Sequence, residues 1–162
     1  MSQDASEPFK IFSKKFDAVL TNPPFGKLEI SSMFGTYEIK SLEQLMALYA
    51  LETMKDNGRA AIIIGGHTVW DDEGRIQKGK NRIFFSYLYQ HYFVDDVINI
   101  SGRHLYSRQG TAFNTRIILI SGRKQVPEGY APLQESDKIS SIPNSPETVD
   151  NFEDLFKRIV VQ

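Results

Sequence analysis

Four consecutive residues, Asn22-Pro23-Pro24-Phe25, combine the polar groups and the stiffness needed to bind a planar amino group. Each proline has a fixed φ and no amide hydrogen, so the segment is rigid and its carbonyl oxygens meet few competing donors. The side-chain oxygen of Asn22 and the carbonyl oxygen of Pro23, aimed at one point, would accept both hydrogens of one amino group. Phe25 would stack on the ring that carries the group. The four residues therefore predict a site for a nucleobase amino group.

A tight turn explains the same residues without any chemistry. In that interpretation Asn22 caps the backbone and Phe25 enters the core. The position in the chain favours a binding site, because Phe16 to Thr21 (FDAVLT) has the pattern of a short buried strand that the prolines end. Loops at the carboxyl ends of strands in an open α/β sheet form the ligand crevice.

The elements that follow predict an α/β fold. A helix with a broad apolar face begins at a capping box of Ser41 and Gln44 and stops at Asn57-Gly58. The next segment, Arg59 to Gly65 (RAAIIIG), is a continuous apolar run, typical of a strand covered on both faces. Strand, helix and strand in this order predict a parallel crossover.

The second half of the chain adds strands of the opposite direction. A helix over Asn81 to Tyr92 carries aromatic residues that we expect in the core, and Val94 to Ile100 and Thr115 to Ser121 are strands joined by an antiparallel return. The sheet is therefore expected to be open and mixed, with flanking helices. We expect a main unit over residues 1–125, a Pro/Ser-rich linker over 126–148 and a C-terminal amphipathic helix over 149–162.

Length and composition restrict the kind of protein. The 162 residues suffice for one globular domain with a core, and the chain has no cysteine. Three scattered histidines give no metal-ligand spacing, so no metal site is expected. No long uncharged apolar segment and no basic leader is present, so we expect neither a membrane span nor a secretory signal. A cytoplasmic protein is the default expectation.

Basic residues are concentrated in the middle of the chain. Residues 75–124 hold nine Lys or Arg and two acids, which gives this block a net charge of +7, whereas the segments on either side each have a net charge of −4. Such a block is typical of a surface that binds a polyanion, although it also fits a solvated surface. The candidate contacts with a DNA backbone are Arg75, Lys78, Lys80, Arg82, Arg103 and Arg108.

The segment FDAVLTNPPFG resembles the catalytic motif of amino-group methyltransferases that use S-adenosylmethionine, especially adenine-N6 DNA methyltransferases of the Type I restriction-modification kind. MKDNGRAAIIIGG resembles the end of the next helix and the next strand of that family. VINISGRHLYSRQGTAFNTRIILISGRK resembles its closing strand, aromatic loop and antiparallel strand. The resemblance covers about residues 10–124 and implies a Rossmann-like methyltransferase fold.

The resemblance also implies roles for single residues. Asn22 and Pro23 would accept the two hydrogens of the target adenine N6, and Phe25 would stack on the base after it is flipped out of the duplex. Tyr106 lies where related enzymes place a second aromatic against the flipped base, although it would equally suit loop packing. Asp4, in QDASEPF, is a weak candidate for contact with the cofactor adenine; an acid on a frayed terminus is the alternative.

The pattern departs from the family at the cofactor site. No glycine-rich turn precedes the first strand, and no strand with an acid for the ribose hydroxyls is seen. We therefore expect the C-terminal catalytic half of a methyltransferase, with S-adenosylmethionine bound in the full-length protein and the first strand at a sheet edge. The expected partners are DNA, specificity or restriction subunits, and a second copy paired through that edge. The alternatives are a catalytically inactive nucleic-acid-binding module and an RNA base amino-methyltransferase.

Overall fold

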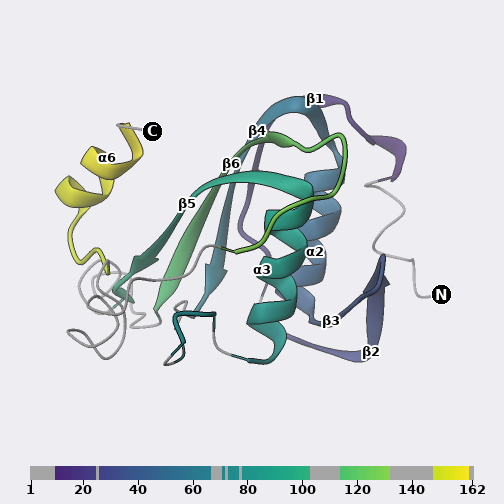
Figure 1. Ribbon diagram of the computed structural model, residues 1–162. Coiled ribbons are helices and arrows are strands. Elements are labelled where there is room, and N and C mark those ends of the chain that lie inside the picture. The colour runs from purple at the N-terminus through teal and green to yellow at the C-terminus, as the bar shows by residue number, and fades with distance from the viewer. Residues whose placement is uncertain are drawn as a thin grey trace.

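The structure is a computed structural model that describes residues 10–24, 26–66, 71, 73–76, 78–102, 114–131 and 148–160. Figure 1 labels its elements. In chain order they are β1 (Phe16–Thr21), β2 (Lys27–Phe34), β3 (Tyr37–Ser41), α2 (Leu42–Glu52), β4 (Met54–Gly65), α3 (Lys80–His91), β5 (Tyr92–Ile100), β6 (Thr115–Arg123) and α6 (Phe152–Val160).

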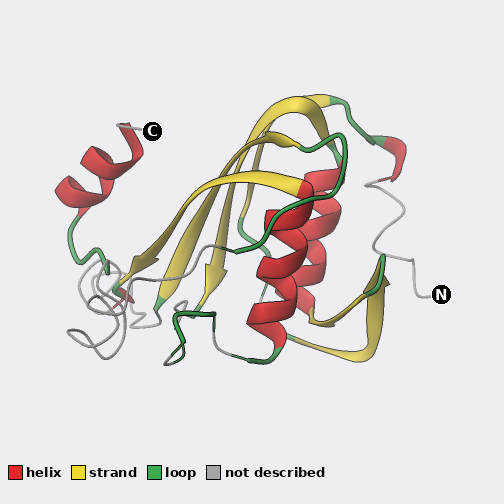
Figure 2. Cartoon of the chain, viewed as in Figure 1, coloured by secondary structure: helices red, strands yellow, loops and turns green. Residues whose placement is uncertain are grey.

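The main sheet has four strands in the order β1-β4-β6-β5. β1 pairs with β4 in parallel, and β6 runs antiparallel to both β4 and β5. The predicted open, mixed sheet is therefore confirmed, as is the parallel crossover from β1 through α2 to β4. β1 lies at one edge of this sheet, as expected (Figure 2).

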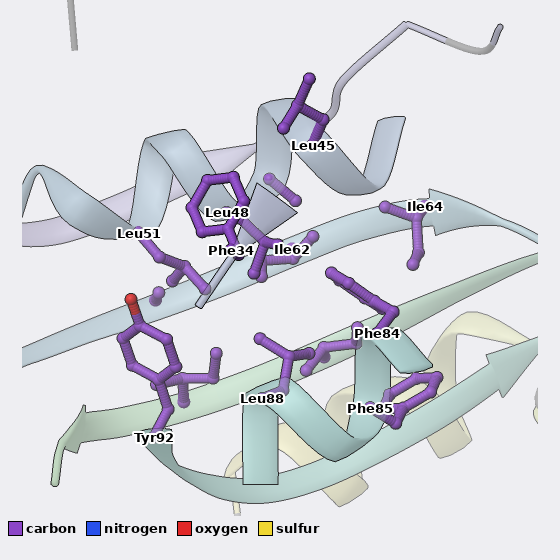
Figure 3. Packing of buried hydrophobic residues seen from close by; sticks show 14 of the residues in the cluster. Phe34, Leu45, Leu48, Leu51, Ile62, Ile64, Phe84, Phe85, Leu88 and Tyr92 are labelled. Carbon is purple, nitrogen blue, oxygen red and sulfur yellow. The ribbon is translucent and has the colours of Figure 1, made fainter. Parts of the chain in front are cut away.

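The larger hydrophobic core fills the space between one face of the sheet and the helices α2 and α3 (Figure 3). Ile62 from β4, Leu48 from α2 and Phe84 from α3 each have at most 1% of their surface exposed. Burying one such side chain stabilises the fold by about 1.5–3 kcal/mol relative to leaving it in water. Of the aromatic residues expected in the core from the second helix, Phe84 is fully buried and Tyr87 is half-buried; Phe85, which was not predicted, is also fully buried.

The opposite face of the sheet is only partly covered. α6 packs on its β5 and β6 end, where Leu155 contacts a smaller cluster that includes Ile98 and Ile117. The guanidinium of Arg158 donates two hydrogen bonds to the carboxylate of Asp96, at 2.7 and 2.6 Å, and so fastens the helix to β5. α6 lies within the segment where the amphipathic helix was predicted.

Two strands are less buried than their apolar sequences predict. β1 was expected to be buried, yet Phe16 is 44% and Leu20 is 77% exposed. β4 was expected to be covered on both faces, but only the face with Ile62 and Ile64 is fully buried, whereas Ala61 and Ile63 are half-buried. The physical reason is that the helices cover one face of β1 and β4, and α6 reaches only the other end of the sheet.

The first long helix begins directly after Ser41, as predicted, but the predicted capping box was wrong. Ser41 makes no capping hydrogen bond through its side chain, and its buried hydroxyl has no partner in the described chain. Gln44 instead donates to the side chain of Asn81 at 3.0 Å. The first amide of the helix, Leu42 N–H, donates instead to the carbonyl oxygen of Gly26 at 3.1 Å, so a backbone contact satisfies this end of the helix in part.

The predicted end of the same helix was also too late. The helix ends at Glu52, where Thr53 donates from both its N–H and its hydroxyl to the carbonyl oxygen of Ala50. Asn57-Gly58 lies in β4, where the pairing register with β1 is irregular. A Cβ on Gly58 would lie 2.6 Å from the Met54 side chain and 3.0 Å from the carbonyl oxygen of Asp17. Glycine is therefore needed there for close approach of two strands, a requirement that looks like a helix stop in the sequence.

The antiparallel hairpin of β2 and β3 was not predicted. Gly35, with φ +60°, occupies the turn that joins the two strands, and Phe34 and Ile39 are buried beside it. Phe34 packs edge-on against Tyr87 of α3, with ring centroids 5.7 Å apart.

In the described residues, no helix has the length and the apolar content to cross a membrane.

Candidate functional site

The Asn-Pro-Pro loop lies at the edge of the sheet formed by the carboxyl ends of β1, β4 and β5. These three strands share one direction, because β6 runs antiparallel to its two neighbours. Asn22 is exposed, Pro23 is buried and Pro24 is exposed directly after β1. Such an edge is where open α/β sheets bind ligands. Phe25 lies outside the described residues.

The loop is held against the start of α2. Besides the hydrogen bond from Leu42 N–H to Gly26, the two residues are in tight contact, since a Cβ on Gly26 would lie 3.2 Å from the Leu42 Cδ2. The next residue of the helix, Glu43, accepts a hydrogen bond from Gly65 N–H at the end of β4, at 3.2 Å. The first turn of α2 therefore connects the ends of β1 and β4.

A pocket of about 430 Å³ opens at the same edge, and we call it the Glu43 pocket. It lies where the C-terminal end of β4 meets the starts of α2, α3 and β6. It is lined by Glu43, Gly65, Gly66, Lys80, Asn81, Asn114 and Arg116. Its volume is within the range of pockets that hold small molecules.

A hydrogen-bonded network forms one wall of the Glu43 pocket. The side-chain oxygen of Asn81 accepts one hydrogen bond from Gln44 Nε2 and one from Arg116 Nη2, both at 3.0 Å. Asn114 accepts a hydrogen bond from Gly102 N–H at 3.3 Å, which joins the end of β5 to the start of β6. The wall is thus built from two helices and two strands and is fixed by the core behind it.

Arg116 brings a buried positive charge to this wall. Only 2% of its surface is exposed, and its guanidinium lies over the ring of Phe85, 5.3 Å from the ring centroid. Burial lowers the pKa of Arg116 to about 10, and the negative charge of Glu43 partly offsets that effect. Arg116 therefore remains protonated at neutral pH, close to a buried carboxylate that is 7% exposed.

Two of the predicted DNA-backbone residues are used inside the protein. Arg82 donates to Asp71 Oδ2 at 2.7 Å and to the carbonyl oxygen of Ile76 at 2.6 Å. Arg75 forms ion pairs with Asp71 and Glu73. Backbone hydrogen bonds from Arg75 and Glu73 are among the causes that hold the pKa of Asp71 below its usual value. Asp71 thus organises the loop before α3 and occupies both guanidinium groups.

Two other predicted cations, Lys78 and Lys80, are exposed next to the start of α3. Two further cations of the basic block are occupied, since Arg123 donates to the carbonyl oxygens of Leu51 and Met54, and Lys124 to that of Tyr89. The sequence count of +7 therefore overstates the charge that the described surface offers to a polyanion. The remaining predicted site residues, Asp4, Arg103, Tyr106 and Arg108, lie outside the described residues.

Sequence reasoning missed Glu43, Asn81 and Arg116 as a group. One signal was present in the apolar strand TRIILIS. The alternation of a strand places the charged Arg116 on the same face as Ile118 and Ile120. The partner residues come from two separate helices, so only the fold brings them together. Within the described ranges, no three or more His, Cys, Asp or Glu side chains gather in a way that could hold a metal ion.

Comparison with solved structures finds chains of the same architecture. A chain from a type I R-M system, solved to describe that system's complex assembly and conformational transition, matches 98% of this chain with a TM-score of 0.54 and 17% identity. The likeness shows the fold. A structure of the type I restriction enzyme EcoKI M protein matches 90% of this chain and 26% of its own, with a TM-score of 0.49 and 14% identity. This chain spans about a third of the first R-M chain's length, since 32% of that chain is covered.

No protein-family sequence profile matches the chain. No curated protein matches it in sequence either. The order and directions of the strands, together with the R-M chain of the same fold, agree with the open, mixed α/β sheet with flanking helices that the sequence predicts.

Proposed function

We propose that this chain is the catalytic half of a DNA methyltransferase that transfers a methyl group to the exocyclic N6 of a flipped adenine. The observation that carries the proposal is the position of Asn22-Pro23 directly after β1, at the edge of the sheet where ligands bind in this architecture. The shared fold with a chain of a type I R-M system supports it.

In this proposal the loop acts by positioning and by polarisation. The side-chain oxygen of Asn22 and the carbonyl oxygen of Pro23 accept hydrogen bonds from the two amino hydrogens, which draws electron density onto the nitrogen that would receive the methyl group; one amino hydrogen would then leave to solvent as a proton. Pro24 keeps the two acceptors in a fixed relation, because its ring removes one backbone freedom and one donor. Phe25 stacks on the flipped base, and Tyr106 supplies a second aromatic surface.

S-adenosylmethionine would supply the methyl group. The residues that the structure describes do not form a complete site for it, because the loop after β1 is Asn-Pro-Pro and its prolines lack the N–H groups that hold anionic parts of a cofactor. We therefore propose that S-adenosylmethionine is held mainly by another part of a longer protein, with Asp4 as the candidate contact from this chain.

The proposed partners follow from the same proposal. DNA would contact the exposed cations Lys78 and Lys80, together with Arg103 and Arg108. Specificity or restriction subunits would supply sequence recognition and cleavage, in a cytoplasmic assembly. Among the described residues no strand pairs with the outer edge of β1, and this edge would pair with a strand of another unit or of a second copy, because an open edge carries unsatisfied backbone groups.

The test compares Asn22→Ala with Asn57→Ala in the longest natural polypeptide that contains this chain. Asn57 is exposed in β4 and provides a matched control at a distance from the loop in sequence. We expect Asn22→Ala to lower methyl transfer to adenine in DNA by about 10²–10³, since one lost acceptor of this kind costs about 2.7–4 kcal/mol. Asn57→Ala should retain activity, and both variants should unfold in urea like the unchanged protein.

Three outcomes would decide against the proposal. Full methylation by a folded Asn22→Ala variant would show that the loop is a tight turn without a role in catalysis. Transfer to RNA but not to DNA would favour the RNA base amino-methyltransferase. Nucleic-acid binding with no transfer by the complete protein would favour the inactive binding module. Within the leading proposal, Phe25→Ala should weaken capture of the flipped base by about 1–3 kcal/mol, and Phe25→Trp should be tolerated better.

A further inference from the structure

We propose that the Glu43 pocket is a second nucleobase site, which receives the hydrogen-bonding edge of a base other than the one held by Asn22. The proposal goes beyond methyl transfer and does not depend on it. It rests on the chemistry of the pocket wall, where a buried carboxylate and a fixed amide stand beside a guanidinium plane and two glycines.

The orientation of the Asn81 amide follows from its neighbours. A guanidinium has only donors, so the Asn81 atom that Arg116 Nη2 meets at 3.0 Å must be the oxygen. Gln44 meets the same oxygen at 3.0 Å and must therefore present its amide nitrogen. With two donors on its oxygen, Asn81 has its NH₂ group directed away from the network. Asn81 lines the pocket, and among the described residues no acceptor meets this NH₂, so the proposal assigns it as the donor for a ligand.

Glu43 supplies the complementary acceptor. One carboxylate oxygen accepts from Gly65 N–H, and within the described chain the other oxygen has no hydrogen-bond partner. A carboxylate that is only 7% exposed is costly to bury unless a positive charge or a donor compensates it. The charge of Arg116 compensates part of that cost. A ligand N–H on the second oxygen would compensate more.

An acceptor and a donor that line one pocket match the edge of a nucleobase. Every base carries, next to each other, an N–H group and a nitrogen or oxygen acceptor, which would pair with Glu43 and Asn81 respectively. Arg116 is 2% exposed and does not itself stack on a base; its guanidinium lies over the ring of Phe85 and donates to the Asn81 oxygen, which fixes the Asn81 amide. Gly65 and Gly66 place no side chain in the way of a planar ring. The pocket volume of about 430 Å³ accommodates one nucleoside.

The experiment is an NMR titration of the 162-residue chain with the four common ribonucleosides and, separately, with ribose 5-phosphate. We expect the nucleosides to shift the amide signals of Gly65 and Gly66 and the side-chain NH₂ signal of Asn81. Ribose 5-phosphate should leave these signals unchanged. If it shifts them as strongly as the nucleosides do, the pocket binds anions and the proposal is wrong.

The decisive variant is Asn81→Asp. Its carboxylate still accepts from Gln44 and Arg116 and so keeps the network, but it replaces the pocket-facing donor by an acceptor. We expect it to weaken nucleoside binding about tenfold or more. Asn57→Asp, the same change at an exposed position of β4, should leave binding unchanged. Unchanged nucleoside binding by a folded Asn81→Asp variant would overturn the proposal.

Two additions separate the sources of the base and the two proposals. A short single-stranded DNA that shifts the same signals at lower concentration than nucleosides would identify a base of the DNA strand as the ligand, whereas equal concentrations would identify a free nucleoside. Asn22→Ala should bind nucleosides in the Glu43 pocket as the unchanged chain does. A loss of methyl transfer with retained pocket binding in Asn22→Ala would support both sites. Retained transfer with lost pocket binding in Asn81→Asp would support the pocket as a base site that methyl transfer does not need.

Discussion

The backbone N–H of Leu42, the first residue of α2, donates to the carbonyl oxygen of Gly26 at 3.1 Å. This bond ties the end of the Asn-Pro-Pro-Phe segment to a helix whose other face is buried. Leu48 and Leu51 of that helix have at most 1% of their surface exposed, so the helix has little freedom to shift. The loop is therefore stiff in itself and anchored to a rigid element, which is the condition for holding two acceptors in a fixed geometry.

The exposed edge of β1 leads to an expectation about self-association. Leu20 is 77% exposed and lines a groove of about 730 Å³ on the uncovered face of the sheet. Leu20→Lys should reduce the concentration-dependent rise in molar mass seen by light scattering, because a charged edge strand resists pairing. The free energy of unfolding should change by less than about 0.5 kcal/mol, as is usual for an exposed side chain.

The matched control for Leu20→Lys is Val160→Lys. Val160 is 80% exposed on α6, so the two variants introduce the same charge at exposed apolar positions on different elements. Val160→Lys should self-associate like the unchanged chain. A chain that is monomeric at all concentrations, or two variants that behave alike, would show that the β1 edge does not pair with a second copy.

The sequence was sufficient for the parts of the fold that depend on local patterns. The apolar runs of β1, β4 and β6 and the apolar face of α3 lie close to their predicted positions, because length and periodicity alone distinguish them. The errors fall where tertiary contacts decide. Gly58 was interpreted as a helix stop, but the approach of Asp17 and Met54 requires it. The capping box of Ser41 and Gln44 was wrong because Gln44 donates to Asn81 of another helix, a contact that only the folded chain makes.

The candidate site divides in the same way. Asn22 and Pro23 stand next to each other in the sequence, so their joint chemistry could be predicted from the motif. Glu43, Asn81 and Arg116 are far apart in the chain, and their network exists only after two helices and a strand are packed. The basic block was overestimated for a related reason. A count of charges in the sequence does not show that Arg82 and Arg123 donate to backbone carbonyl oxygens.

Exposed lysines should set the salt dependence of DNA binding. Replacing Lys78 and Lys80 together by Gln should lower the magnitude of the slope of log affinity against log salt by about 2 if both contact phosphates. Fluorescence anisotropy over a salt series measures this slope. Lys157→Gln on α6, where the lysine is 69% exposed and paired with Glu153, provides the control and should leave the slope unchanged. Equal slopes for all three proteins would exclude Lys78 and Lys80 from the DNA contact.

His91 makes a contribution to stability that depends on pH. Its ring stacks on Tyr87 with centroids 4.2 Å apart, and its carbonyl oxygen accepts from Lys124 N–H at 2.8 Å. Burial, followed by the positive charge of Lys124, lowers the pKa of His91. The unfolded chain, with a histidine pKa of about 6.5, therefore binds more protons at this residue than the folded chain does. Stability must then rise with pH through this range and fall on acidification.

The test is His91→Phe, which keeps a ring against Tyr87 and removes the titration. The difference in the free energy of unfolding between the unchanged chain and this variant should shift against the unchanged chain as the pH falls from about 8 to about 5, with the change centred at or below about pH 6.5. Glu52 opposes this trend in both proteins, because burial raises its pKa and its protonation at low pH favours the folded state. Taking the difference removes the Glu52 contribution, so urea unfolding at several pH values isolates His91. Parallel curves across that range would mean that the ring of His91 titrates in the folded chain as it does in the unfolded one.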